Sequence, residues 1–207
     1  MPRIEEVQHL LAGLWLLIQG KPEGFSHFDF SMDGLLRSFW AIVWTLPALA
    51  IAWAAWRLDF LGNMPPGTQT GPSYFLRLFV VEVISWVFPL VLIALLAGPL
   101  GFARLVVPIV ITSNWLSVPL SYALAVPMAL QLLFPAGGVI ALLAMMLLFT
   151  AIMALFRLLR TVTGNQLLLA TTLTVIFLLT PILIEGKLDA LFGLVASPQT
   201  AADTVSP

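Results

Sequence analysis

The chain has 207 residues, of which 60% are hydrophobic and only 9% are charged, with a net charge of −1. Soluble domains carry about 25% charged residues, so this chain has too few charges to cover a water-facing surface. The near-zero net charge excludes the basic surface that binds nucleic acid, and the lack of cysteine excludes disulfides and thiolate chemistry. We therefore expect an all-α, polytopic transmembrane helical bundle.

Residues 1–34 are expected to form an N-terminal interfacial amphipathic helix followed by a loop. Apolar residues recur at near-helical spacing over residues 4–19, and polar residues crowd the start of this run. The run is too short to cross a bilayer comfortably, so a helix lying in the membrane surface is the preferred interpretation. A sixth span is the alternative. Glu5 and Glu6 make the start acidic, which disfavours a cleaved signal peptide.

No metal or cofactor site is predicted in this segment. Residues 29–34 resemble the start of a calcium loop, but the twelfth position is Trp40, where a bidentate glutamate is required. The two histidines, His9 and His27, precede the first long apolar run, so no histidine pair within the membrane could hold haem. We interpret His27 and Asp29 as surface polar residues.

The residues just before the first long apolar run predict a helix start. Ser31 or Asp33 is expected to cap this helix, because short oxygen-bearing side chains accept hydrogen bonds from free backbone N–H groups. Asp33 and Arg37 stand four residues apart, which predicts an ion pair along one helix face.

Five apolar runs within residues 35–187 predict five transmembrane spans. A span needs about 20 apolar residues at a rise of 1.5 Å per residue. The predicted spans cover residues 38–56, 75–97, 105–133, 137–156 and 167–184. The tail, 188–207, is expected to be disordered at least from residue 197, because its small and polar residues bury too little apolar surface.

Tryptophan marks both ends of the first predicted span. Trp40 and Trp44 lie at one end, and Trp53 and Trp56 at the other. Indole prefers the lipid headgroup layer, which suits its apolar ring and its N–H donor, so these four residues are predicted interfacial anchors.

The third predicted span contains Pro108, Pro119 and Pro127. Each proline lacks the N–H group that an uninterrupted helix requires, and each can bend the helix. A single tilted or kinked helix is the preferred interpretation, and two half-spans are the alternative.

Glu82 is the only acidic residue within a predicted span. A carboxylate at that depth costs a few kcal/mol unless it is paired, protonated or hydrated. We expect Glu82 to face the third span, with Asn114 or Ser117 within reach, and to be partly protonated at neutral pH. A proton or cation site is the functional interpretation, and a bond to a neighbouring helix is the structural one.

A polar stripe runs along the third predicted span. Its members are Ser113, Ser117 and Ser121, which recur every four residues, with Asn114 and Tyr122 beside them. Residues at this spacing share one helix face, so the stripe could line a small polar cavity with Glu82. Contact between neighbouring helices is the alternative, because small hydroxyl side chains commonly occupy such interfaces.

Lysine and arginine are distributed unequally between the two sides of the predicted bundle. With the N-terminus inside, the inner side receives Arg3, Lys21, Arg37, Arg104, Arg157 and Arg160, and the outer side receives Arg57, Arg77 and Lys187. Because inner loops carry the excess of positive charge, we predict a cytoplasmic N-terminus and an external C-terminus.

The segments 20–25 (GKPEGF) and 28–39 (FDFSMDGLLRSF) resemble a family of uncharacterised small bacterial inner-membrane proteins, mostly alphaproteobacterial. The five-span layout with a cytosolic N-terminus is also similar, in layout alone, to the Yip1 class of membrane proteins. The first resemblance implies the bacterial inner membrane, and neither resemblance implies an activity.

Two functional classes fit this sequence. The first is a non-catalytic membrane protein that acts as a scaffold, assembly or lipid- and helix-binding component, because no catalytic constellation is present. Its partners would be membrane lipid, other membrane subunits or a second copy, and it would need no cofactor. The second is a small permease or channel subunit that uses Glu82 and the polar stripe.

Overall fold

The computed structural model describes residues 2–64, 70–134 and 137–194, and within these ranges the chain is helical, with no strand. Five helical segments there are long and apolar enough to cross a membrane. The predicted all-α bundle with five spanning helices is confirmed. The elements are α1 (Ile4–Ile18), η1 (Pro22–His27), α2 (Met32–Ser38), α3 (Ala41–Gly62), α4 (Pro72–Ala97), η2 (Ala103–Leu105), α5 (Val106–Leu133), α6 (Gly138–Val162) and α7 (Leu167–Leu191).

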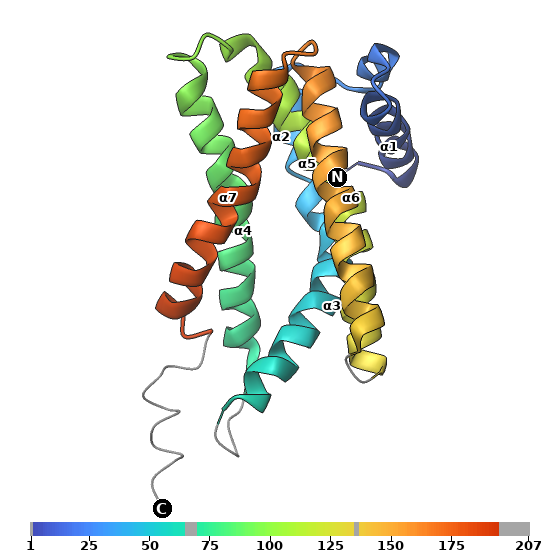
Figure 1. Ribbon diagram of the computed structural model, residues 1–207. Coiled ribbons are helices and arrows are strands. Elements are labelled where there is room, and N and C mark those ends of the chain that lie inside the picture. The colour runs from blue at the N-terminus through green and yellow to red at the C-terminus, as the bar shows by residue number, and fades with distance from the viewer. Residues whose placement is uncertain (1, 65–69, 135–136, 195–207) are drawn as a thin grey trace, which may run out of the picture.

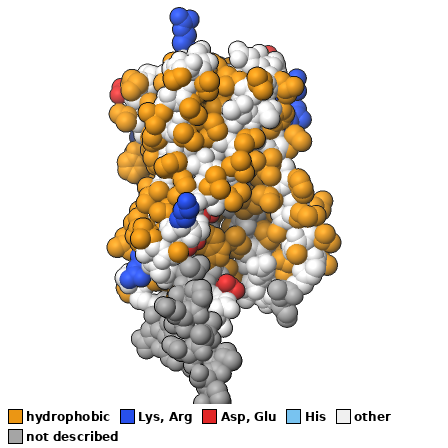
Figure 2. All heavy atoms as spheres, turned by 60° about the vertical axis from the view of Figure 1, so that its left-hand side comes forward, with side chains coloured by type: hydrophobic (Ala, Val, Ile, Leu, Met, Phe, Trp, Pro, Cys, Tyr) orange, Lys and Arg blue, Asp and Glu red, His pale blue; other side chains and the backbone are white. Residues whose placement is uncertain are grey.

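Helices α3 to α7 run side by side along the length of the molecule (Figure 1). The segments α1 and α2 and the α4–α5 and α6–α7 connections lie near one end, which we call the α1 end. Helix α7 finishes at the opposite end, which we call the α7 end, as an odd number of crossings requires. Hydrophobic side chains dominate the face shown in Figure 2, and its few charged side chains lie mostly toward the two ends.

The core forms around α5, which contacts α1, α2, α3, α4 and α6. Helix α4 packs mainly on α7, and α6 joins α5 to α7. Fully buried aliphatic side chains from different helices meet in this core, among them Leu14, Ile93, Ile109, Leu158 and Leu173.

Helix α1 has 15 residues and is not among the five spanning segments. It packs on η1, α6 and α5 instead of crossing as a sixth helix. The last carbonyl groups of α1 are tied to α6, because Nε of Arg157 donates to the oxygen of Ile18 at 2.8 Å. The Thr161 hydroxyl likewise donates to the oxygen of Leu17 at 2.9 Å.

The helices in the region of the first predicted span, 38–56, have bounds that differ from those of the span. Ser38 ends the short helix α2, and the chain passes through a tighter turn before α3 begins at Ala41. In this turn the backbone N–H groups of Phe39 and Trp40 donate to carbonyl groups three residues earlier, as in a 3-10 helix. Helix α3 then continues to Gly62. The predicted span ended before Arg57 because a charge interrupts the apolar run, but a charged residue does not end a helix.

Charged residues likewise do not end the helices that contain the later predicted spans. Helix α6 runs to Val162 and α7 to Leu191, well beyond the predicted ends at residues 156 and 184. Glu185 and Asp189 therefore lie within α7, so Glu82 is not the only acidic residue on a spanning helix. The predicted tail began at residue 188, but residues 188–191 belong to α7. The disorder predicted from residue 197 lies outside the described residues.

Helix α5 is one continuous helix rather than two half-spans, with Pro119 and Pro127 inside it. Pro108 lies in its first turn, where a backbone N–H has no partner within the helix. The expectation of a single helix, rather than two half-spans, is therefore confirmed.

Candidate functional site

The structure brings part of the predicted polar site together. Glu82 on α4 and Ser117 and Ser121 on α5 line one small cavity of about 30 Å³, with Thr45 of α3 beside them. The remaining lining side chains are Ile42, Leu49 and Trp86. Glu82 therefore shares a cavity with Ser117 on the third span, as we expected.

Asn114 and the rest of the stripe do not line this cavity. Asn114 is fully buried, and its Nδ2 donates to the hydroxyl of Ser38 at 2.9 Å, so of the two expected neighbours of Glu82 only Ser117 lines the cavity with it. The Ser113 hydroxyl donates to the carbonyl of Val110 in its own helix. Tyr122 is exposed. The partner of Asn114 stands 76 residues away in the chain, which helical spacing cannot show.

The predicted cap is present, but the predicted ion pair is not. The Ser31 hydroxyl accepts from the backbone N–H of Gly34 at 3.1 Å, which caps α2. Arg37 pairs with Glu6 on α1 at 3.3 Å rather than with Asp33. Helix α1 lies close enough to α2 to offer a carboxylate from outside the helix, and this tertiary contact replaces the local pair.

The four predicted tryptophan anchors divide into two pairs. Trp40 and Trp56 are exposed, in keeping with an interfacial position. Trp44 packs against the main core, and Trp53 packs against the cluster formed by α4 and the end of α7. Their indole nitrogens are buried and have no hydrogen-bond partner within the described part of the chain. Trp44 and Trp53 therefore act in helix packing.

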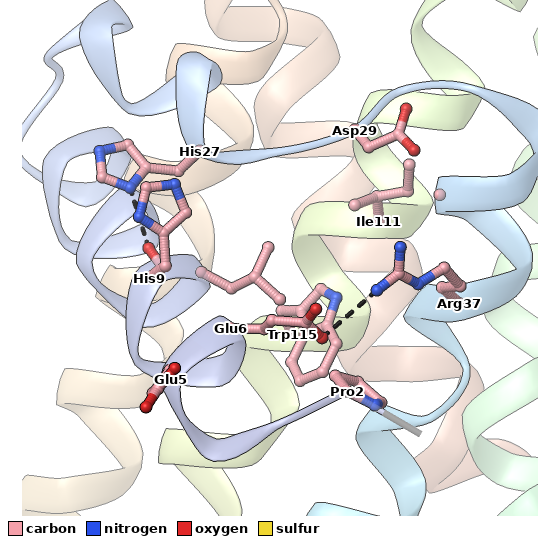
Figure 3. Close-up of a pocket in the computed structure, with 11 residues that line it drawn as sticks. Pro2, Glu5, Glu6, His9, His27, Asp29, Arg37, Ile111 and Trp115 are labelled. Atoms are coloured by element: carbon pink, nitrogen blue, oxygen red, sulfur yellow. Dashed lines mark hydrogen bonds and ion pairs between the residues drawn. The ribbon is translucent and has the colours of Figure 1, made fainter.

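A much larger pocket, of about 400 Å³, lies between α1, η1, α2 and α5 (Figure 3). This volume falls within the range of roughly 300–1,000 Å³ that small-molecule sites occupy. We call it the α1 pocket, and its lining residues are Pro2, Glu5, Glu6, His9, Leu10, His27, Asp29, Gly34, Arg37, Ile111 and Trp115.

Two imidazoles form one wall of the α1 pocket. The rings of His9 and His27 lie with their centroids 4.1 Å apart. Nδ1 of His27 lies 2.9 Å from the carbonyl oxygen of His9, and because a carbonyl can only accept, this nitrogen is the donor. In the neutral ring, Nε2 of His27 is therefore left as an acceptor. Figure 3 shows both rings on the side of the pocket opposite Arg37.

Close backbone packing holds this wall in place. A Cβ on Gly13 of α1 would overlap the side chain of His27, so only glycine lets α1 approach η1 this closely. A Cβ on Gly24 would lie 2.6 Å from the carbonyl oxygen of Gly13. The two histidines are thus positioned by a contact that leaves no room for larger residues.

Asp29 and the Glu6–Arg37 pair form the other polar wall. Asp29 accepts from the backbone N–H of Ser31 at 2.9 Å. This bond, followed by the Ser31 hydroxyl, lowers the pKa of the Asp29 carboxyl, so Asp29 is ionised at neutral pH. Glu6 also accepts from the backbone N–H of Arg3. Its carboxylate is therefore fixed at the start of α1 and directed toward Arg37.

The α1 pocket combines an acidic rim with an apolar floor. Three carboxylates line it against one guanidinium, so with neutral histidines the lining is net negative. The floor consists of Leu10, Ile111 and Trp115. Such a lining suits a ligand that carries an amine and an apolar part, and the lone guanidinium offers a partner for an anionic group on the same ligand.

Sequence interpretation missed this pocket because its residues come from four elements. One signal was available: both histidines and five of the ten acidic residues precede Gly34, in a chain with few charges. Within the described residues, no group of three or more histidine, aspartate or glutamate side chains could hold a metal ion.

No known protein family, curated protein or solved structure matches this chain. The resemblance of residues 20–25 and 28–39 to small inner-membrane proteins therefore stays a prediction.

Proposed function

We propose that this protein is a non-catalytic membrane protein that binds an amphiphilic amine, with an aminophospholipid headgroup as the ligand class. The α1 pocket carries this proposal, because it places three carboxyl side chains and a guanidinium around an apolar floor. The ammonium of the headgroup would bind Asp29. Its phosphate would bind Arg37, and the first carbons of the lipid would cover Trp115.

The location of the pocket supports a lipid ligand. The α1 end gathers six of the nine lysine and arginine residues, which attract anionic phosphate groups. Ile111 and Trp115 lie five and nine residues after the start of α5 at Val106, or about 8 and 14 Å along its axis. The floor thus lies deeper than the helix end, where acyl chains begin below their headgroups.

The composition of the lining supports binding rather than catalysis. Among the residues that line the pocket, none is serine, threonine, cysteine, lysine or tyrosine. Covalent catalysis by a hydroxyl, thiol or amine nucleophile therefore has no side chain to carry it in this lining. His27 donates to a backbone carbonyl, so its orientation is fixed without a carboxylate to activate it.

Lipid binding by purified protein tests the proposal. Native mass spectrometry should show retention of phosphatidylethanolamine over phosphatidylglycerol, and free phosphoethanolamine should bind more weakly because it lacks the apolar part. Asp29→Asn should weaken binding of short-chain phosphatidylethanolamine by about tenfold or more, because a hydrogen bond to a charged group contributes about 1.5–3 kcal/mol.

Glu23→Gln is the matched control, since Glu23 lies on η1 outside the pocket lining and should bind lipid like the unaltered protein. Equal retention of the two lipids, or full binding by Asp29→Asn, would overturn the proposal. Arg37→Gln should weaken binding of the lipid and of free phosphoethanolamine alike, because both carry the phosphate.

A small permease or channel subunit is the second candidate, favoured by the cavity that joins Glu82 to Ser117 and Ser121. Its volume of about 30 Å³ has room for only one or two water molecules. Asn114, which transport through the polar stripe would require, is bonded to Ser38 instead. A substrate flux into proteoliposomes that Glu82→Gln abolishes would favour this candidate over lipid binding.

We further propose that the α1 end faces the cytoplasm and that the bilayer is the bacterial inner membrane. The excess of lysine and arginine at the α1 end supports the orientation. The resemblance of residues 20–25 and 28–39 supports the choice of membrane.

A further inference from the structure

The cavity beside Glu82 is separate from the α1 pocket and shares no lining residue with it. Glu82 lies ten residues after Pro72 and fifteen before Ala97, or about 15 and 22 Å from the two ends of α4. Its carboxylate therefore lies within the apolar thickness of a bilayer. An ionised carboxylate at that depth needs a compensating positive charge, and no basic side chain lines the cavity.

Two of the three hydroxyl groups in the cavity have already used their protons. Ser117 donates to the carbonyl of Asn114 at 2.6 Å, and Thr45 donates to the carbonyl of Ile42 at 2.8 Å. A hydroxyl has one proton and two lone pairs, so each of these groups can offer only lone pairs to the cavity. Ser121 contributes a third hydroxyl oxygen.

The cavity is therefore rich in acceptors and poor in donors. Its oxygen atoms come from three helices, α3, α4 and α5, and its other walls are the apolar Ile42, Leu49 and Trp86. Oxygen ligands are those that small hard cations prefer. One carboxylate with neutral hydroxyls balances a single positive charge, and the volume of about 30 Å³ excludes an organic cation.

We propose that the cavity between α3, α4 and α5 binds one small monovalent cation of the size of sodium through Glu82, Thr45, Ser117 and Ser121. Helix α4 packs mainly on α7 and makes few contacts with α5. A cation held between these oxygen atoms would join α4 to α3 and α5 at mid-depth. Cation binding should therefore stabilise the folded bundle.

Thermal unfolding of the full-length protein in detergent tests the proposal, in sodium, lithium, potassium or choline chloride at equal ionic strength. Sodium should raise Tm in a saturable manner, by about 3–6 °C at tenfold its Kd, whereas choline should not. Binding of radioactive sodium should saturate at one ion per chain.

Glu82→Gln keeps the size of the side chain but removes its charge, so the sodium-dependent shift and the bound ion should both be lost. Ser121→Ala should bind sodium at least several-fold more weakly, and it provides a second test if Glu82→Gln folds poorly. Asp59→Asn is the matched control, because Asp59 is exposed on α3 and does not line the cavity, so the shift should remain.

Three results would overturn the proposal. The first is a shift of equal size in sodium and choline, and the second is a full shift in Glu82→Gln. The third is an infrared band of a protonated carboxyl that is lost in Glu82→Gln but is unchanged when sodium is added. That result would show that Glu82 holds a proton rather than a sodium ion. Asp29→Asn should keep the sodium effect, so this inference and the lipid proposal can fail separately.

Discussion

Gly34 shows how strictly single residues shape the α1 pocket. A Cβ at this position would overlap the carbonyl oxygen of Asp29, which lies directly against the first turn of α2. This contact keeps the Asp29 segment folded back onto the helix, where the Asp29 carboxylate reaches the N–H of Ser31. A larger residue would have to displace the backbone that positions the carboxylate.

Gly34→Ala should therefore destabilise the protein by about 1–3 kcal/mol, the usual cost of forcing an extra methyl group into a packed site. It should also weaken lipid binding at the α1 pocket. Thermal unfolding in detergent provides the first measurement and lipid titration the second. Gly62→Ala is the control, because a Cβ there meets nothing within 4 Å and alanine favours helix. An unchanged Tm for Gly34→Ala would contradict the packing argument.

A buried hydrogen bond joins the side chains of Asn114 and Ser38. Both side chains are fully buried, and their bond joins α5 to the junction of α2 and α3. Ser38→Ala should cost about 1 kcal/mol, because side-chain bonds between membrane helices average about 0.6 kcal/mol with a maximum near 1.7. Thr150→Ala, which removes an exposed hydroxyl bonded within α6, should leave unfolding unchanged. If Ser38→Ala and Thr150→Ala changed the free energy of unfolding equally, the bond between Asn114 and Ser38 would contribute no more to stability than a hydroxyl bonded within its own helix.

At the scale of elements, the sequence predicted which segments are helices more accurately than where they end. Hydrophobic runs of sufficient length identify spans, but α6 and α7 continue through Arg157 and Glu185. They end near Gly164 and Gly193, whose positive φ angles of 65° suit glycine at a helix C-terminus. Helix ends are therefore better predicted from these glycines than from the first charge.

The attachment of α1 depends on two side chains of α6, and it can be tested without disturbing the bundle. Thr161→Val removes the hydroxyl that donates to the carbonyl of Leu17. Hydrogen exchange and proteolysis within residues 4–18 should then increase, while Tm of the five long helices should change little. Thr171→Val is the control, since this exposed hydroxyl is bonded only to the carbonyl of Leu167. Unchanged protection of α1 would indicate that apolar packing alone holds it.

For the whole molecule, composition alone was enough to predict a membrane bundle, whereas neither cavity could be predicted completely. The spacing of Ser117 and Ser121 placed them on one face, and the depth of Glu82 marked it as a polar site. Thr45 and Trp86 join that cavity only through the packing of α3 on α5 and of α4 beside them. The α1 pocket brings together His9 and residues as distant in the chain as Trp115, which no local pattern encodes.

The arrangement of charges predicts one orientation for the whole chain. The α1 end carries six lysine and arginine residues and the α7 end three, and five crossings place the two chain ends on opposite sides. A reporter fused at Gly164, in the α6–α7 connection at the α1 end, should be active only in the cytoplasm. A reporter at the C-terminus should be active only outside, because the side with more positive charge is retained inside. A cytoplasmic C-terminus together with a cytoplasmic Gly164 would contradict the five-span topology. If both reporters lie on the sides opposite to these, the count of spans holds, the α1 pocket opens toward the external leaflet, and its lipid must be sought there.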